Sequence, residues 1–590
     1  MDQYRSEKSG EISPSQPLYG GDGHVYPANG AGTAPPARLN LLRRPIGAVL
    51  SGSRPAVPAS IVNILVALYL VCGINIPFWK AFYERLGLDS AGHWAFFILT
   101  GVAMWMAFNI ILSPFSWKPI HKPLILLVLV ISSTCSYFMQ SYGIIIDNHM
   151  IINIMETDSR EASELITWSM FSHLLLLGGL PALLLMFVRI TYKPWKRELL
   201  ARGGMMLGSG ILLFALILAG FKQVTLFGRQ NRDLRMYVIP TYPIYSAIKA
   251  AKKHGKGNQA EPVRVIAADA AKPAHAKRAV ILVVGETARS INFSLNGYER
   301  DTNPGLKNRE VFSFTDVQSC GTNTAESVPC MFSHLERENY SRSEAGKYEN
   351  VLDVLQRAGV QVLWRDNNSG SKGVADRVIF QDLANAADRT LCSTEECYDE
   401  ILLKDLDTVL QQNTGDILVV LHQKGSHGPA YYKRFPEKFA RFLPQCTQDN
   451  VQDCDPTSIV NAYDNTILYT DALLSQVIDI LKEQQYATAM LYVSDHGESL
   501  GEKNIYLHGL PYAIAPKEQK HVPMIFWGSD MFLREKGIER QSLTAGLHAP
   551  LSHDYLFHSL LGLFQVATEA YRPELDIFHR TVTPSGTVRE

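Results

Sequence analysis

Three residues that could hold a cation stand at the ends of two apolar segments. Glu286 follows the segment 279–284 (AVILVV), and Asp495 and His496 stand at the end of the segment 488–495 (TAMLYVSD). If both segments are parallel strands of one sheet, their carboxyl ends meet at one edge, and we expect the three side chains to converge there. Two carboxylates and an imidazole suit Zn²⁺, with Mn²⁺ or Mg²⁺ as alternatives. A DHGE sequence is also common in solvated turns, so this motif alone leaves the question open.

A threonine lies within a short run that two cysteines enclose. Residues 319–330 read SCGTNTAESVPC, and a helix is expected to begin near Thr324. A threonine hydroxyl at a helix N-terminus can cap the helix or act as a nucleophile. The helix dipole and free N–H groups favour a nearby phosphate, and a coordinated metal would lower the hydroxyl pKa. The residues alone leave both roles open.

Two polar loops and a further histidine could complete a pocket. One loop reads NNSGSK (367–372), and another, HQKGSHGP (422–429), follows an apolar segment. A single histidine in such a position is more often structural than functional. Taken together, these residues are typical of a phosphate or metal pocket: Asn368, Ser369, Lys372, His422, His427 and His508.

An α/β domain must position these residues. Short apolar segments alternate with helical patterns in the second half of the chain, which is typical of a mostly parallel sheet buried on both faces. The strands are predicted at 279–284, 360–364, 416–422, 488–495 and 522–527, and helices at 349–358 and 458–483.

The first half of the chain carries five apolar segments long enough to span a bilayer. They are predicted at Ile61–Trp79, Trp94–Ser113, Pro123–Ile145, Trp168–Val188 and Gly204–Phe227. The first begins too far along the chain for a cleaved signal peptide. The average composition, with 46% hydrophobic residues, would by itself describe a soluble protein, so the membrane prediction rests on how these residues are distributed.

Basic residues gather in the loops on one side of these spans. Arginines precede the first span, and Lys and Arg fill the loops after the second and fourth, whereas the opposite loops are acidic. Because cytoplasmic loops carry the excess of Lys and Arg, the N-terminus is predicted in the cytoplasm and the chain after Phe227 on the far side. The net charge of −1 argues against a nucleic-acid partner.

Six cysteines lie in the second half as close pairs, and pairing between neighbours is the simplest arrangement. Disulfides predict an oxidising compartment such as a bacterial periplasm. Zinc-thiolate binding is a weaker alternative, because no CxxC spacing occurs. The expected pairs are Cys320 with Cys330, Cys392 with Cys397, and Cys446 with Cys454.

The loop between the third and fourth spans carries a polar repeat. Asn153, Thr157 and Glu161 recur every four residues, so on one helix they would form a single stripe. The stripe is either an ordinary solvated face or a contact site for a lipid headgroup at the membrane surface.

Several motifs together resemble the lipid A phosphoethanolamine transferases, a branch of the alkaline phosphatase and sulfatase-like superfamily that includes polymyxin-resistance determinants. They are GETAR (285–289), NFSLNGYERDTNP (292–304), the run 319–333, DNNSGSKGV (366–374), GSHGP (425–429) and VSDHGESLGE (493–502). The resemblance extends over nearly all of residues 60–575. It implies a five-helix transmembrane bundle followed by a sulfatase-like α/β domain.

The resemblance also implies a role for each site residue. Thr324 would be the nucleophile and would join Glu286, Asp495 and His496 around a zinc ion, with a second metal as an alternative. The phosphate of phosphoethanolamine, or a second metal, would be held by Asn368, Ser369, Lys372, His427 and His508. His422 would be a further pocket histidine, and the stripe would contact the donor headgroup. In this chain Ser371 and Ala375 replace cysteines of many relatives, and Glu326 stands where some have an aromatic residue.

The implied reaction transfers phosphoethanolamine from phosphatidylethanolamine to a phosphate of lipid A through a phospho-threonine intermediate, and so confers polymyxin resistance. The protein would be a monomer of the inner membrane of a Gram-negative bacterium. The rivals are transfer of another headgroup such as phosphoglycerol, modification of a core sugar, and a non-catalytic membrane-anchored binding protein. The expected domains are 1–57 as a disordered cytoplasmic tail, 58–227 as the transmembrane domain, 228–277 as an interfacial linker, 278–575 as the periplasmic catalytic domain and 576–590 as a C-terminal tail.

Overall fold

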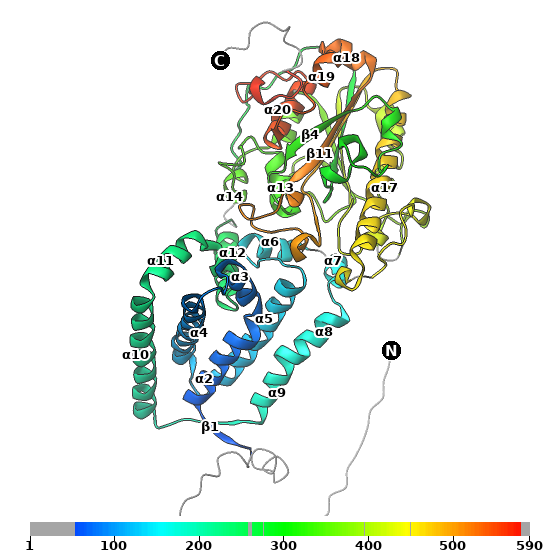
Figure 1. Cartoon of the computed structure of the whole chain (residues 1–590). Coiled ribbons are helices and arrows are strands. Elements are labelled where there is room, and N and C mark those ends of the chain that lie inside the picture. The colour runs from blue at the N-terminus through cyan, green and yellow to red at the C-terminus, as the bar shows by residue number, and fades with distance from the viewer. Residues whose placement is uncertain are drawn as a thin grey trace, which may run out of the picture. The chain divides into compact units, whose positions relative to one another are not determined.

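The computed structural model describes residues 54–579 except 158, 258–261, 275, 394–395 and 449; the side chains of residues 159 and 253–257 are also outside the description. The two predicted tails therefore lie outside the described residues up to position 53 and from position 580. All contacts given below lie within the unit Ala56–Glu590. Figure 1 follows this unit from the first helices, in blue, to the end of the α/β domain, in red.

Four helices in the described part of the chain are long and apolar enough to cross a bilayer. Two of them, α4 (Ala91–Leu112) and α5 (His121–Ser141), correspond to the second and third predicted spans. The fourth prediction corresponds to Trp168–Phe187, where a π-helical turn joins α8 (Trp168–Leu174) to α9 (Leu180–Phe187). The last, α10 (Trp195–Ala219), begins earlier than the predicted Gly204 and ends where Gly220 separates it from the next helix.

The predicted first span, Ile61–Trp79, is not one continuous helix. Here α2 (Ala59–Tyr69) passes through a π-helical turn, and the chain then bends by 59° into α3 (Ile76–Leu86). Pro77 lacks the N–H that would continue the helix, and the Asn75 amide instead donates to a carbonyl of the preceding turn at 2.8 Å. The membrane domain thus has four spans, or five if this bent pair is one span.

Two helices, α11 (Phe221–Gln230) and α12 (Thr241–Gly257), cover the first part of the predicted interfacial linker. Ile244, Tyr245 and Ile248 expose apolar surface on α12. Apolar side chains beside lysines are typical of a helix at a membrane surface. The interfacial role and the boundaries of the linker stay predictions.

The α/β domain contains an eight-stranded sheet with the order β12-β4-β11-β8-β3-β7-β5-β6. The predicted strands are confirmed, as β3 (Arg278–Gly285), β5 (Gln361–Asp366), β7 (Ile417–His422), β8 (Ala487–Ser494) and β11 (His521–Gly528). Of these, β11 runs antiparallel to both of its neighbours, and the others pair in parallel. Sequence patterns missed β4 (Phe312–Gln318), β6 (Ile379–Asp382) and β12 (Leu551–Ser552), which are short or carry polar residues.

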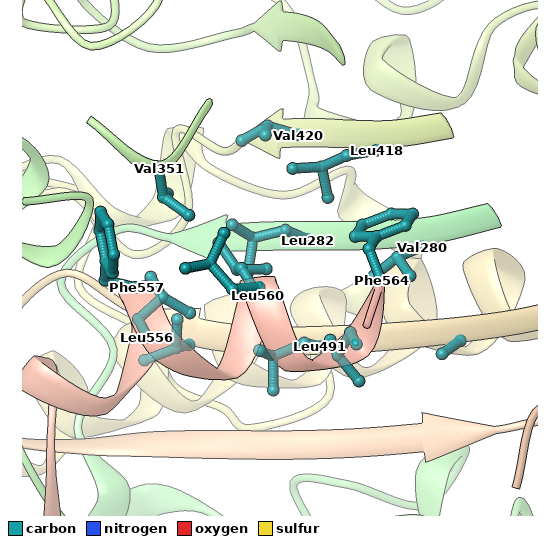
Figure 2. Close-up of a cluster of buried hydrophobic side chains, with 14 of the residues drawn as sticks. Val280, Leu282, Val351, Leu418, Val420, Leu491, Leu556, Phe557, Leu560 and Phe564 are labelled. Carbon is teal, nitrogen blue, oxygen red and sulfur yellow. The ribbon is translucent and has the colours of Figure 1, made fainter. Parts of the chain in front are cut away.

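Both faces of the sheet are covered by helices. On one face Val280 and Leu282 of β3 pack with Leu560 of α20 (Asp554–Leu563), as Figure 2 shows. On the other face Ile281 and Val283 belong to a core with α17 (Pro456–Lys482). Successive residues of β3 thus enter opposite cores, as the two-residue period of a strand requires.

The predicted helices and disulfides also form. The predicted helices 349–358 and 458–483 correspond to α15 (Val351–Arg357) and α17, and Asn350 and Asp353 cap the start of α15. All six cysteines of the α/β domain pair with their neighbours, as Cys320–Cys330, Cys392–Cys397 and Cys446–Cys454.

Candidate active site

The structure brings the three predicted cation ligands together. Glu286 follows β3, and Asp495 and His496 follow β8; the two strands are neighbours, with Gly285 opposite Ser494. One ligand atom from each of the three lies within 4.8 Å of the others, and all three residues are buried. Convergence at the strand ends is therefore observed, as expected from the parallel pairing.

Backbone contacts hold these side chains in place. The Oδ1 atom of Asp495 accepts from the His496 N–H at 2.7 Å, and Nδ1 of His496 lies 2.9 Å from the Gly497 carbonyl. The other imidazole nitrogen, Nε2, therefore points to Glu286 Oε1 at 3.2 Å and to Asp495 Oδ2 at 3.4 Å. A carbonyl partner on one ring nitrogen is typical of histidines that bind metals through the other.

The charges of the cluster fit a divalent cation. Asp495 Oδ2 is buried and has no hydrogen-bond partner among the described residues. Burial opposes the charge of His496, but Asp495 and Glu286 outweigh it and raise the His496 pKa to about 9. Burial and the neighbouring Glu286 raise the pKa of Asp495. This negative potential can stabilise a bound metal ion as well as a proton, so the residues present fit Zn²⁺.

Thr324 is the first residue of α13 (Thr324–Met331) and lies against the same cluster. The helix cap is Asn323, whose side chain accepts from the Glu326 N–H at 3.0 Å. Thr324 is therefore not needed as the cap. Its Oγ1 lies 3.1 Å from both carboxylate oxygens of Glu286 and 3.4 Å from Nε2 of His496. Of the two roles left open by the sequence, this geometry favours the nucleophile.

The loop after β5 reaches the cluster through one of its three predicted residues. Asn368 donates from Nδ2 to Glu286 Oε2 at 2.7 Å, and its Oδ1 accepts from the Ser369 N–H at 2.7 Å. The Lys372 ammonium lies 2.8 Å from the Ser369 hydroxyl. Asn368 thus contacts a candidate ligand directly, whereas the lysine is joined to it through Ser369.

The predicted histidines form two groups. The His508 ring lies 4.4 Å from the His496 ring and 5.4 Å from the His427 ring, centroid to centroid. Burial lowers the pKa of His427 to about 3, so this ring is neutral at neutral pH. His422 is fully buried, with its Nδ1 at 2.7 Å from Asp366 and its Nε2 without a hydrogen-bond partner among the described residues.

One acidic residue of this pocket was missed from the sequence. Glu498 is fully buried, and its Oε2 lies 3.3 Å from Nδ1 of His508. Its Oε1 has no hydrogen-bond partner in the described part of the chain. The signal was present, because Glu498 is the last residue of the DHGE motif that contains Asp495 and His496.

The polar repeat between the third and fourth spans does not form a single stripe, so that expectation is wrong. Helix α6 (Asn148–Glu156) ends at Thr157, which is extended with ψ of 130°, and α7 (Ser159–Glu164) is a separate helix. The Thr157 hydroxyl turns back to the Asn153 carbonyl at 2.8 Å, which satisfies the end of α6. Asn153 and Glu161 therefore lie on different helices.

Acidic residues of this loop instead make ion pairs with the α/β domain. Glu161 lies 2.6 Å from the ammonium of Lys424, a residue that stands between His422 and His427 in the sequence. Two further carboxylates surround Arg434, whose side chain is only 1% exposed: Glu164, at 2.5 Å, and Glu396. The same guanidinium donates to the His427 carbonyl at 2.7 Å. Arg434 thus joins the histidine loop to α7.

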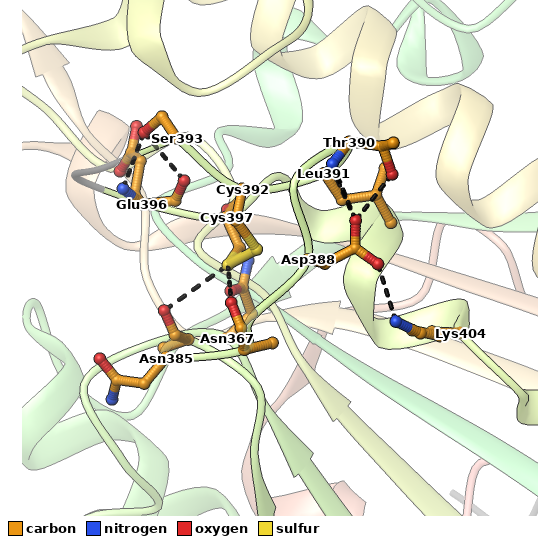
Figure 3. The surroundings of a disulfide bond; sticks show 12 residues. Asn367, Asn385, Asp388, Thr390, Leu391, Cys392, Ser393, Glu396, Cys397 and Lys404 are labelled. Atoms are coloured by element: carbon orange, nitrogen blue, oxygen red, sulfur yellow. Dashed lines mark hydrogen bonds and ion pairs between the residues drawn. A yellow bond between two sulfur atoms is a disulfide. The ribbon is translucent and has the colours of Figure 1, made fainter.

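The Cys392–Cys397 disulfide shapes the wall that carries Glu396. Figure 3 shows this bridge beside Asn367, whose amide donates to the Cys397 carbonyl at 3.0 Å. Asn367 directly precedes Asn368, so the bridge supports the loop that reaches Glu286. A small polar pocket opens between α7 and this wall, and Glu161, Asn368 and Lys424 are among its lining residues.

Comparison with known proteins places both halves of the chain in one family. The family model "Phosphoethanolamine transferase EptA/EptB" matches residues 104–254, and the model "Sulfatase" matches residues 278–566. The phosphoethanolamine transferase EptA of Escherichia coli strain K12 is 39% identical over 533 residues, which cover 89% of this chain and 97% of that protein. The phosphatidylethanolamine transferase Mcr-1 of Escherichia coli is 40% identical over 522 residues, 85% of this chain and 94% of that protein.

A solved structure extends the likeness to the fold. The integral membrane protein lipooligosaccharide phosphoethanolamine transferase A (EptA) from Neisseria meningitidis superposes with a TM-score of 0.86 at 34% identity, over 90% of this chain and 100% of that one. The chain is therefore an integral membrane protein with a sulfatase-like α/β domain, and it belongs to the phosphoethanolamine transferase family.

Proposed function

We propose that this chain transfers phosphoethanolamine from phosphatidylethanolamine to a phosphate of lipid A, with Thr324 as the nucleophile. The observation that carries the proposal is the position of the Thr324 hydroxyl, 3.1 Å from Glu286 in a buried candidate metal cluster, while Asn323 caps the helix in its place. The family relatives support the transferred group.

The reaction proceeds in two displacements at phosphorus. In the first, Thr324 Oγ1 forms a bond to the donor phosphorus, the bond from phosphorus to the diacylglycerol oxygen breaks, and diacylglycerol leaves with a proton. In the second, a phosphate oxygen of lipid A forms a bond to the phosphorus of the phospho-threonine, the bond from phosphorus to Thr324 Oγ1 breaks, and Oγ1 regains a proton from the attacking phosphate or from water. The N-terminus of α13 faces the phosphate that is transferred, and its free N–H groups stabilise negative charge there.

Zinc is the proposed cofactor, held by Glu286, Thr324, Asp495 and His496. When bound, it supplies a Lewis acid that lowers the hydroxyl pKa and neutralises phosphate charge. Asn368 orients Glu286 through its 2.7 Å hydrogen bond. His427 and His508 are the proposed proton carriers, since both rings lie beside the cluster.

The donor headgroup is proposed to bind between the cluster and α7. The proposed headgroup contacts stay Asn153, Thr157 and Glu161, although Asn153 lies on α6, Glu161 lies on α7 and Thr157 lies between the two helices. Ser369, Lys372 and His422 complete the proposed phosphate pocket. A catalytic domain on the periplasmic side of the inner membrane agrees with its three disulfides and with the basic cytoplasmic loops.

Mass spectrometry of lipid A tests the proposal. Expression of the intact chain in a Gram-negative host should add the mass of one phosphoethanolamine unit to lipid A and reduce its binding of polymyxin, because an added ammonium offsets phosphate charge. Thr324→Ala should abolish the added mass while the chain still binds zinc. Addition of phosphoglycerol, or modification confined to a core sugar, would instead support the rival reactions.

A further inference from the structure

Two cations, Arg337 and Lys520, lie on the opposite side of the cluster from the proposed donor pocket. The Arg337 guanidinium lies 3.2 Å from the ring centroid of Tyr512, and the Lys520 ammonium lies 5.0 Å from the same centroid. Among the described residues, neither cation makes an ion pair. Two like charges at one aromatic ring repel each other: burial, together with the nearness of Arg337, lowers the Lys520 pKa.

The side-chain contacts of the two cations are to backbone carbonyls. Arg337 Nε donates to the Cys320 carbonyl at 3.1 Å, and Lys520 Nζ donates to the Tyr512 carbonyl at 3.3 Å. The carboxylate of Asp554 accepts from the Arg337 backbone N–H at 2.8 Å rather than from its guanidinium. Most N–H donors of the guanidinium and ammonium therefore remain available to a ligand.

Hydrogen bonds connect Tyr512 and Lys520 to the loops that carry the candidate site residues. The Tyr512 hydroxyl donates to the Ser319 carbonyl at 2.9 Å, and the Ser319 N–H donates to the Lys520 carbonyl at 2.8 Å. The Gly497 N–H, next to His496, donates to the Gln519 carbonyl at 3.0 Å. The two cations are thus held beside the loop that leads to Thr324 and beside the segment that carries the candidate metal ligands.

The sheet order separates the two sides of the reaction. Ser319 follows β4 and Lys520 precedes β11, and both strands lie on one side of β8 and β3. Asn368 and Lys424 follow β5 and β7 on the other side, where Glu161 of the loop between the spans also lies. A ligand at Arg337 and Lys520 would therefore approach the cluster from the side away from the donor pocket.

We propose that Arg337 and Lys520, held over Tyr512, bind a phosphate group of the glycolipid acceptor other than the one that reacts. A guanidinium fork and an ammonium both donate to phosphate oxygens, and the anion removes the repulsion between them. This inference rests on the proposed function, because it assumes a phosphorylated acceptor. It makes the pair a determinant of acceptor recognition that leaves the donor step unaffected.

The test separates acceptor binding from chemistry. Full-length Arg337→Gln/Lys520→Gln protein in lipid nanodiscs is compared with Arg572→Gln/Arg377→Gln, which removes two cations that are paired with Glu336 and Asp353. The first displacement is measured as diacylglycerol release in the absence of acceptor. The second is measured as transfer to lipid A, and its KM is determined for a diphosphorylated and for a monophosphorylated lipid A.

We expect the Arg337/Lys520 variant to raise KM for the diphosphorylated acceptor by about tenfold or more, the size of a lost charge-assisted hydrogen bond. Its rate of diacylglycerol release and its KM for the monophosphorylated acceptor should equal those of the wild type. The control variant should equal the wild type in all three measurements. An unchanged KM, an equal rise for both acceptors, or slower diacylglycerol release would overturn the assignment.

A binding measurement distinguishes failure of the site from failure of the proposed function. In the Thr324→Ala background, which cannot react, the diphosphorylated glycolipid should bind about tenfold more weakly when Arg337 and Lys520 are also changed. If the wild type releases no diacylglycerol, the proposed function is wrong, yet this affinity difference still supports the site. Equal affinity would reject the site whatever the reaction.

Discussion

The two sides of the Thr324 cluster differ in how their cations are neutralised. On the side of β7, the buried Arg434 and the mostly buried Lys424 are paired with glutamates from the loop between the third and fourth spans. On the side of β4 and β11, Arg337 and Lys520 share an aromatic ring without a carboxylate partner among the described residues. Paired cations hold segments together, whereas unpaired ones are available to a ligand. Substitution of the cations on the first side is therefore expected to lower stability, and substitution on the second side is expected to lower substrate affinity.

Removal of the proposed zinc ion should give the largest effect, because it acts on the cluster that both sides share. Treatment of the full-length protein with a zinc chelator should slow both diacylglycerol release and transfer by at least about a hundredfold, since several kcal/mol of charge stabilisation is lost. Added Zn²⁺ should restore both. Rates are compared with the zinc content measured by mass spectrometry, and full activity in metal-free protein would refute the assignment.

Loss of Arg434 should give the largest change in stability on the paired side. Arg434→Met removes the guanidinium from Glu164 and Glu396, whose side chains are only 9% and 17% exposed, so we expect the free energy of unfolding to fall by about 3 kcal/mol. Arg441→Met is the matched control, because Arg441 is 51% exposed and pairs with an exposed Asp301; it should cost at most about 1 kcal/mol. Chemical denaturation in detergent measures both, and similar losses would contradict the structural role of Arg434.

The Lys424–Glu161 pair should be coupled more weakly, because only one carboxylate is involved. A double-mutant cycle with Lys424→Met and Glu161→Gln should give a coupling energy between about 0.5 and 3 kcal/mol in unfolding. Both single variants should also slow diacylglycerol release if Glu161 contacts the donor. Independent, additive effects on stability would show that the ion pair does not fasten α7 to the α/β domain.

The difference between the two sides also explains what could be predicted from the sequence. Glu286, Asp495 and His496 were predictable because each follows a strand whose apolar run is easy to recognise. The ion pairs of Arg434 were not, since its partners lie far apart in the sequence and follow no periodicity. The repeat of Asn153, Thr157 and Glu161 was misleading, because an extended residue at Thr157 breaks the helix that the spacing assumed. Local patterns thus predicted the strands and their ends, but not the contacts between distant segments.

The smallest effect is expected where a pair lies close to Thr324, the proposed nucleophile, but is partly open to solvent. Glu326, in the first turn of α13, lies 3.0 Å from Nδ1 of His149 on α6, and the two side chains are 20% and 39% exposed. Water screens such a pair, so its contribution should stay below about 1 kcal/mol, which is less than about a fivefold change in rate. The Glu326→Gln variant should therefore transfer phosphoethanolamine at nearly the wild-type rate, with Ser343→Ala, on α14 (Arg342–Ala345), as the control. A tenfold or greater loss of transfer rate would mean that Glu326 acts on the substrate itself. The start of α13 would then serve substrate binding rather than stability, as is proposed for Arg337 and Lys520.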